Sequence, residues 1–277
     1  MNTLFISDLD GTFLDPKGEL TPFAADTINA LTAAGANFTF ATARSVYSAK
    51  PLMSPADIRI PCLLMNGVSL YDLRSERCIS NEFIPVSASA EILRAFEKHG
   101  VHCFMYRIDH DVLICYYSAL TTKVMQSFAE SRKKQYLKPF VQLERLADMA
   151  DHSAVYFTTT GPYEELLPLK NEIEHIPGIS LAFYLDVYNG AWYLEIFSEK
   201  ASKSNGIGKL RKLYGFDRVI AFGDNLNDLP MFEVSDVRIA VENARPEVKA
   251  AADIVVPPNS EDGAAKWLAE NYRRYTE

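Results

Sequence analysis

Short apolar runs alternate with helix-like stretches over the first part of the chain. Each run ends abruptly at polar residues, as a strand does when it leaves a buried sheet. The first helix-like stretch begins at Thr21-Pro22, an N-cap followed by proline, and closes at Gly35, a residue typical of a helix end. Strands that alternate with helices predict a parallel sheet with right-handed crossovers. The predicted strands are 4–7, 37–41 and 62–65, and a brief helix before the third is limited by Pro51 and Pro55.

The pattern changes near residue 84 into units of one helix and two strands. In the first unit, Ser87 or Ser89 caps a helix that ends at Gly100, and two apolar runs follow around an Asp-His-Asp turn. Adjacent strands with hairpin-like joins predict an α+β module with an antiparallel sheet. Its remaining predicted elements are helices near 119–134 and 162–176 and strands at 154–159, 179–186 and 191–197.

The first pattern returns after about residue 196, which indicates that the α+β module is an insertion. A helix at 204–214 leads into the apolar run 219–222, which ends at Gly223-Asp224. Helical stretches at 230–234 and 246–252 and strands at 237–241 and 254–256 follow. We therefore predict an α/β protein with a parallel-sheet core, residues 1–83 and 196–277, and an inserted α+β domain, residues 84–195.

The composition excludes several classes of partner. The 277 residues carry a formal net charge of −8 without any block of Lys or Arg, which argues against a nucleic-acid or anionic-membrane surface. No apolar run is long enough for a membrane span, and no signal peptide is visible. The four cysteines form no CxxC pair, so we expect free thiols in a reducing compartment. These features predict a cytoplasmic protein, and they say nothing of its oligomeric state.

Acidic residues gather where the predicted parallel strands end. Asp8 and Asp10 follow the first strand, and Asp224 and Asp228 follow the strand at 219–222. Ligands of an open parallel sheet bind beyond the carboxyl ends of its strands, so neighbouring strands would bring these carboxylates to one spot. Like charges at this density need a hard cation, and oxygen ligands without His or Cys favour Mg²⁺.

Basic residues are placed to balance the remaining charge. Arg44 follows the second strand, and Lys203 begins the helix that leads to the Asp224 strand, with Lys200 as its rival. A phosphate, four carboxylates and one Mg²⁺ together carry a net negative charge. Nearby cations must neutralise this charge. A helix N-terminus also favours an anion.

Four motifs in this order resemble those of the haloacid dehalogenase-like phosphohydrolases. They are DLDGT at 8–12, TAR at 42–44, the lone Lys203 and GDNLND at 223–228. GDNLNDLPM and a large α+β insertion after the second motif are similar to the Cof-type sugar-phosphatase branch. The resemblance covers the whole chain. It implies a Rossmann-like core and a cap domain that closes over the leaving group and selects the substrate.

The resemblance implies a role for each motif residue. Asp8 would attack phosphorus to give an aspartyl-phosphate, and Asp10 would protonate the leaving oxygen and later activate water. These two duties explain why two aspartates stand one residue apart. Mg²⁺ would be held by the Asp8 carboxylate, the Asp10 backbone carbonyl, Asp224 and, directly or through water, Asp228. The phosphate and substrate contacts would come from Leu9, Thr42, Ala43, Arg44, Asn66, Lys203 and Asn227.

Some of these roles have competing explanations. Ala43 stands where the family commonly has glycine, and its backbone N–H is still available for a phosphate contact. Thr42 could also be a helix N-cap, Arg44 a structural cation and Asn66-Gly67 a hairpin turn. Tyr188 and Asn189 are weaker candidates for substrate contact.

The predicted activity is Mg²⁺-dependent hydrolysis of a small phosphorylated substrate, with sugar phosphates as the first choice. Esters of the pyridoxal phosphate or FMN type are the next choice. The chain could also be a phosphomutase, or a non-catalytic module that binds a phosphometabolite.

Overall fold

The computed structural model describes residues 1–150, 153–186 and 190–276. Tyr188 and Asn189 therefore lie outside the described residues. The chain forms two compact units: the first is Met1–Ser80 with Ala201–Glu277, and the second is Asn81–Lys200. None of the described helices is both long and apolar enough to cross a membrane.

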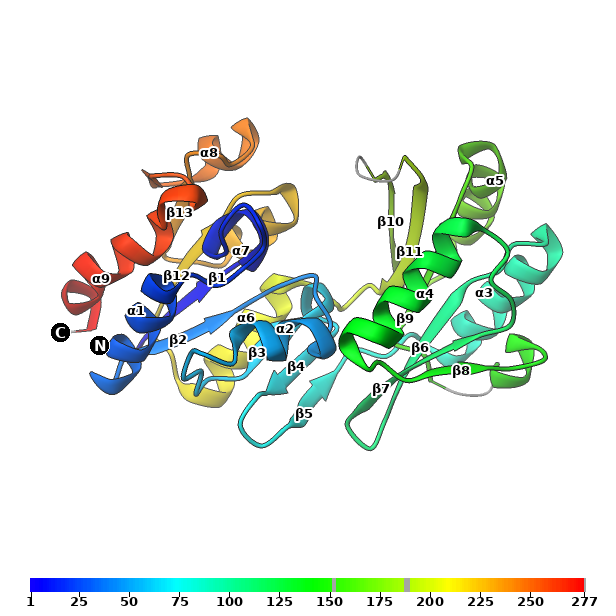
Figure 1. Ribbon diagram of the computed structural model, residues 1–277, viewed down its shortest axis with the longest axis horizontal. Coiled ribbons are helices and arrows are strands. Elements are labelled where there is room, and N and C mark those ends of the chain that lie inside the picture. The colour runs from blue at the N-terminus through cyan, green and yellow to red at the C-terminus, as the bar shows by residue number, and fades with distance from the viewer. Residues whose placement is uncertain (151–152, 187–189, 277) are drawn as a thin grey trace. The chain divides into compact units, whose positions relative to one another are not determined.

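A parallel sheet of five strands is the centre of the first unit (Figure 1). Its strands, in spatial order, are β14 (Ile254–Val256), β13 (Val237–Val241), β12 (Arg218–Gly223), β1 (Thr3–Ser7) and β2 (Asn37–Phe40). All neighbouring pairs are parallel, as the sequence predicts. Ser7 pairs with both Phe222 and Phe40, so the ends of β12, β1 and β2 lie side by side.

Helices cover this sheet and bury its apolar side chains. The sheet strands are almost wholly buried, and their Phe, Leu, Ile and Val side chains form one core with the helices. The helices are α1 (Pro22–Ala33), α2 (Val46–Met53), α6 (Lys203–Tyr214), α7 (Leu229–Glu233), α8 (Pro246–Ala251) and α9 (Gly263–Thr276). Short helical turns are η1 (Leu9–Phe13), η2 (Met65–Gly67), η4 (Leu226–Asp228) and η5 (Asn259–Glu261).

A small sheet follows β2 in the chain, and only its first strand was predicted. It consists of β3 (Cys62–Leu64), β4 (Ser69–Asp72) and β5 (Arg77–Asn81), and an Ala41–Leu63 bridge links β3 to the end of β2. β3 and β4 are antiparallel, so Asn66-Gly67 does connect a hairpin. Strands β4 and β5 and helix α9 were not predicted. The limit placed at Pro51 was wrong, because α2 includes Pro51, where a short helix loses only one hydrogen bond.

The second unit contains a six-stranded sheet. Its strands are β10 (Ile179–Leu185), β11 (Trp192–Ser198), β9 (Tyr156–Gly161), β6 (Phe104–Asp109), β7 (Val112–Tyr117) and β8 (Phe140–Gln142). Its helices are α3 (Val86–His99), α4 (Lys123–Tyr136) and α5 (Tyr163–Ile173), with a short turn η3 (Leu146–Met149). Apolar residues spaced three or four apart on α3 and α5 pack on one face of this sheet.

Two details of the second unit differ from what the sequence predicts. Strand β8, which was not predicted, pairs with β7 in parallel, although the remaining described pairs are antiparallel as predicted. Helix α3 has Pro85 at its N-cap position, whereas Ser89, one of the predicted caps, lies buried inside the helix. All four cysteines are free, as expected.

Candidate active site

A buried lysine lies between two aspartates at the ends of the central strands. Lys203 is the first residue of α6, and its Nζ lies 2.6 Å from Asp8 Oδ1 and 2.6 Å from Asp228 Oδ1. The exposed fraction is 6% for Asp8, 2% for Lys203 and 0% for Asp228. Because all three are withdrawn from water, each charge depends on its neighbours for compensation.

The start of α6 is fixed by close packing against the β3–β4 connection. Gly67 has φ +95°, and a Cβ there would lie 2.2 Å from the Ser202 carbonyl oxygen. Ser202 caps the helix by accepting a hydrogen bond from the Asn205 N–H. Lys203 therefore enters the site at a defined position, whereas its sequence rival Lys200 is exposed.

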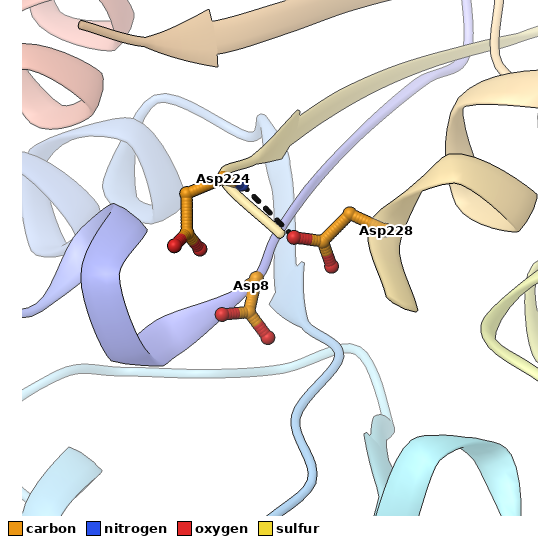
Figure 2. Close-up of side chains that lie close together, drawn as sticks. All are labelled: Asp8, Asp224 and Asp228. Carbon is orange, nitrogen blue, oxygen red and sulfur yellow. Dashed lines mark hydrogen bonds between the residues drawn. The ribbon is translucent and has the colours of Figure 1, made fainter. Parts of the chain in front are cut away.

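The third carboxylate, Asp224, comes from the end of β12. Its Oδ1 accepts a hydrogen bond of 2.7 Å from the Thr12 hydroxyl. Gly11, with φ +81°, passes so close that a Cβ would lie 2.5 Å from Asp224 Oδ2. Oxygen atoms of Asp8, Asp224 and Asp228 all lie within 4.8 Å of one another, and Figure 2 shows the three carboxyl groups converging.

Asp228 also shapes the loop that presents Asp224. Its Oδ2 accepts the N–H groups of Asp224 at 2.9 Å and Asn225 at 3.0 Å, the first drawn as a dashed line in Figure 2. With Oδ1 on Lys203, both oxygens of Asp228 have protein partners. Gly223 is needed here as well, because a Cβ would lie 2.6 Å from Asp228 Cβ.

Asp10 does not join this cluster with its side chain. Its carboxylate forms a bidentate salt bridge with Arg44. Arg44 Nε donates to Asp10 Oδ2 at 2.7 Å, and Nη2 donates to Oδ1 at 2.6 Å. The Asp10 side chain is 50% exposed and that of Arg44 23% exposed. Asp8 and Asp10 thus have different cations, which explains how the fold tolerates two like charges one residue apart.

The rest of the predicted residues lie at the ends of β2 and β3 and in the loop after β12. Thr42 is fully buried, its Oγ1 accepts the Arg44 N–H at 3.1 Å, and its carbonyl accepts the Asn66 N–H at 2.9 Å. Asn227 Nδ2 donates to Asn66 Oδ1 at 3.2 Å. Leu9 is fully buried, whereas Ala43 is exposed.

The electrostatics of the cluster call for another cation. Burial, the largest influence, raises the pKa of Asp8 to about 8 even though Lys203 opposes the shift. Burial likewise raises the pKa of Asp224 to about 6 against the hydrogen bond from Thr12. Burial alone would lower the pKa of Lys203, but Asp8 and Asp228 outweigh it and the pKa is raised. One lysine faces three acidic groups, and this all-oxygen donor set fits a hard divalent cation.

Comparison with known proteins identifies the family. The family model of haloacid dehalogenase-like hydrolases matches residues 5–268. The chain belongs to this family. The resemblance drawn from the motifs, including that to the Cof-type branch, is confirmed, and so is the fold of a parallel-sheet core with an inserted domain.

Three relatives of this hydrolase span almost its full length. Pyridoxal phosphate phosphatase YbhA of Escherichia coli K12 is 26% identical over 270 residues, 94% of this chain and 95% of the relative. The 5-amino-6-(5-phospho-D-ribitylamino)uracil phosphatase YwtE of Bacillus subtilis 168 is 26% identical over 279 residues, with the same two coverages. The crystal structure of TM0651 from Thermotoga maritima has a TM-score of 0.81 at 27% identity, covering 98% of this chain and 97% of that one.

Sequence reasoning missed two residues that hold the site of this hydrolase together. Thr12 was quoted within DLDGT but given no role, although it holds Asp224. Asn243 donates from Nδ2 to the Gly11 carbonyl at 2.7 Å, and no sequence motif indicates this role for Asn243. The role of Thr12 could have been inferred from its place in the DLDGT motif. The role of Asn243 could not, because only the folded structure brings it next to Gly11.

Proposed function

We propose that this hydrolase is a Mg²⁺-dependent phosphatase that cleaves small phosphomonoesters through an aspartyl-phosphate on Asp8. The observation that supports the proposal best is Lys203 held at 2.6 Å from both Asp8 and Asp228, beside Asp224. This arrangement combines a buried carboxylate nucleophile with a fixed positive charge and a place for a divalent cation. Phosphoryl transfer requires these parts because its catalysis is mainly positioning and charge neutralisation.

Asp8 and Asp224 would hold Mg²⁺ with their carboxylates, together with the Asp10 backbone carbonyl. Asp228, whose oxygens accept hydrogen bonds from Lys203 and from the Asp224 and Asn225 N–H groups, would hold the ion directly or through water. Bound Mg²⁺ would neutralise charge on the phosphoryl oxygens and the three aspartates. The phosphoryl oxygens would be held by the Lys203 ammonium, the Thr42 hydroxyl and the N–H groups of Leu9 and Ala43. The Asn227 amide, which lies next to Asn66, would also contact them.

In the first step, an Asp8 oxygen forms a bond to phosphorus as the bond from phosphorus to the ester oxygen breaks. Asp10 gives a proton to that leaving oxygen and the alcohol departs. In the second step, Asp10 takes a proton from water, whose oxygen attacks phosphorus. The bond from Asp8 to phosphorus then breaks, which frees inorganic phosphate and restores the carboxylate.

The sequence left two roles open for Arg44, a phosphate contact and a structural cation, and we assign it the second. Because Arg44 forms a bidentate salt bridge with Asp10, we infer that it positions the Asp10 carboxyl group for acid–base catalysis and does not bind the phosphate.

The substrate class is proposed from the relatives and from the motifs. YbhA and YwtE are named for pyridoxal phosphate and for a phosphorylated ribitylamino compound, and the Cof-type motifs point to sugar phosphates. We propose a small, soluble phosphate ester of these classes, with the unit Asn81–Lys200 selecting its leaving group. The proposal includes a cytoplasmic location, and it holds for a monomer and for an oligomer alike.

Phosphate release from a panel of esters tests the proposal. Sugar phosphates, pyridoxal phosphate, FMN and p-nitrophenyl phosphate would each be incubated with Mg²⁺ or with EDTA. The expected result is release that needs Mg²⁺ and is lost in Asp8→Asn, which keeps the shape of the side chain but not the nucleophile. Activation by a bisphosphate would indicate a phosphomutase. Tight phosphate binding without release from any ester would favour a binding module and would contradict the proposal.

A further inference from the structure

The turn between β3 and β4 has an unusual backbone conformation. Met65, Asn66 and Gly67 follow one another with φ values of +52°, +55° and +95°. Only glycine adopts such values without cost, and they are rare for a long side chain such as that of Met65. The common two-residue hairpin turn needs two such residues, so the hairpin alone does not account for all three. Residues held in this way persist only where other contacts fix them, and they are frequent at functional sites.

The backbone of this turn is fixed by the TAR motif at the end of β2. The Met65 N–H donates to the Arg44 carbonyl at 3.0 Å, and the Asn66 N–H donates to the Thr42 carbonyl at 2.9 Å. Two successive N–H groups of the turn therefore bond to the segment that is expected to contact the phosphate. These bonds provide the constraint that the left-handed conformation requires.

The same turn contacts two further segments of the site. Gly67 packs directly on the carbonyl of Ser202, the residue before Lys203. The side chain of Asn66 accepts a hydrogen bond of 3.2 Å at Oδ1 from Nδ2 of Asn227, which belongs to the GDNLND motif. The turn itself is part of none of the four motifs, yet it contacts TAR, GDNLND and the start of the helix that carries the lysine.

The bond between the two asparagines determines how the Asn227 amide is oriented. One end of an amide group donates two hydrogen bonds and the other end accepts them. Because the NH₂ end of Asn227 is bonded to Asn66, one N–H remains for a phosphoryl oxygen. Without this bond the amide can rotate and present its carbonyl oxygen, which repels an anion.

We propose that the turn Met65–Gly67 is a positioning element of the phosphate site and that Asn66 acts through Asn227. Asn66 is thus a positioning residue that does not bind the substrate itself. The inference rests on the proposed phosphatase function and adds to it a residue outside the four motifs that controls phosphate binding.

A double-mutant cycle tests this inference. Asn66→Gly removes the side chain and keeps the left-handed backbone, which glycine adopts freely, and Asn227→Ala removes the amide. We would measure kcat/KM for the ester that the parent cleaves best, and the dissociation constant of inorganic phosphate with Mg²⁺, in the parent, both single variants and the double variant. Asn66→Gly should weaken both quantities about 3- to 10-fold, the usual effect of one neutral hydrogen bond. In the Asn227→Ala background it should have no further effect.

Glu76→Gly is the matched control. It makes the same kind of exchange at a left-handed residue, φ +57°, in the turn between β4 and β5. It should keep the parent values of kcat/KM and of phosphate affinity. Thermal unfolding of all variants shows that each one is folded.

Each outcome decides the inference. Equal losses with and without the Asn227 amide would make Asn66 an independent ligand and would overturn it, as would parent values in either single variant. If the parent cleaves no ester but binds phosphate, the proposed phosphatase function fails, and the cycle is decided by the phosphate dissociation constants from isothermal titration calorimetry. A folded parent that neither cleaves an ester nor binds phosphate would overturn both.

Discussion

Lys203 shows at the scale of one residue how the site and the stability of the fold depend on each other. Its ammonium lies between two buried carboxylates, those of Asp8 and Asp228. A cation of this kind both prepares a site for an anion and makes burial of the aspartates possible. Its removal should therefore affect more than catalysis.

Lys203→Met is expected to abolish turnover and to lower the free energy of unfolding by about 3–5 kcal/mol, because two buried carboxylates lose their partner. Chemical denaturation and phosphate release would measure the two effects. Lys200→Met, three residues earlier and exposed, is the matched control and should behave like the parent. A Lys203→Met protein as stable as the parent would show that the aspartates do not need this charge.

Arg44 provides a second test at this scale. If it positions Asp10, Arg44→Ala should lower kcat by about 10²-fold, the usual cost of a misplaced catalytic group, with little change in KM. Arg44→Lys keeps the charge but loses the bidentate geometry, so its kcat should lie between those of Arg44→Ala and the parent. Steady-state kinetics on one good ester gives both constants. A large rise in KM at unchanged kcat would instead make Arg44 a substrate ligand.

The motifs predicted which residues gather, but not how their side chains pair. The placement of Asp8, Asp224, Asp228 and Lys203 followed from strand ends and a helix start, which sequence patterns mark well. The pair of Arg44 with Asp10 joins residues that are 34 positions apart. Nothing in their spacing distinguishes it from a phosphate contact, because either role needs the same residue type at the same strand end.

At the scale of elements, helix α6 contains two glycines with opposite roles. A Cβ at Gly206 would lie 2.4 Å from Leu63 Cδ2 in the core, whereas one at Gly208 would meet nothing within 4 Å. The first glycine allows α6 to pack closely against β3, and the second has no such constraint.

Gly208→Ala should raise the free energy of unfolding by about 0.5–1 kcal/mol, the usual gain from replacing glycine within a helix. Gly206→Ala should lower it by about 1–3 kcal/mol, because the core must shift to admit the methyl group. Thermal unfolding of both variants measures the difference, with each variant serving as the control for its counterpart. Equal shifts of the same sign would contradict the close packing of α6 on β3.

Elements with strong local signals were predicted, and those without them were not. The central strands are nearly continuous apolar runs, and α1 has a clear cap at Thr21. Strand β5 is largely exposed or half-buried and lacks an apolar run. Helix α9 fully buries Gly263, Ala264, Ala265 and Leu268, all in its first half, and only partly buries Trp267, Tyr272 and Tyr275, so it lacks a continuous run of aliphatic residues.

At the scale of the whole molecule, metal binding should stabilise the folded chain. The carboxylates of Asp8, Asp224 and Asp228 come from segments far apart in sequence and are not gathered in the unfolded state. Mg²⁺ at 100 times its dissociation constant should therefore add about 2.7 kcal/mol to the free energy of unfolding. Thermal unfolding with Mg²⁺ and with EDTA measures this shift. Asp224→Asn should reduce it strongly, and a shift of parent size in that variant would exclude Asp224 as a ligand.

The central claim is that Asp8 carries the phosphoryl group during turnover. The most direct measurement is acid quenching of the hydrolase during steady-state turnover of its best ester, followed by mass spectrometry of the peptide that contains Asp8. Our account predicts one added phosphoryl group on Asp8 in the parent and none in Asp8→Asn. Phosphate release by a parent protein whose Asp8 remains unmodified under these conditions would contradict it.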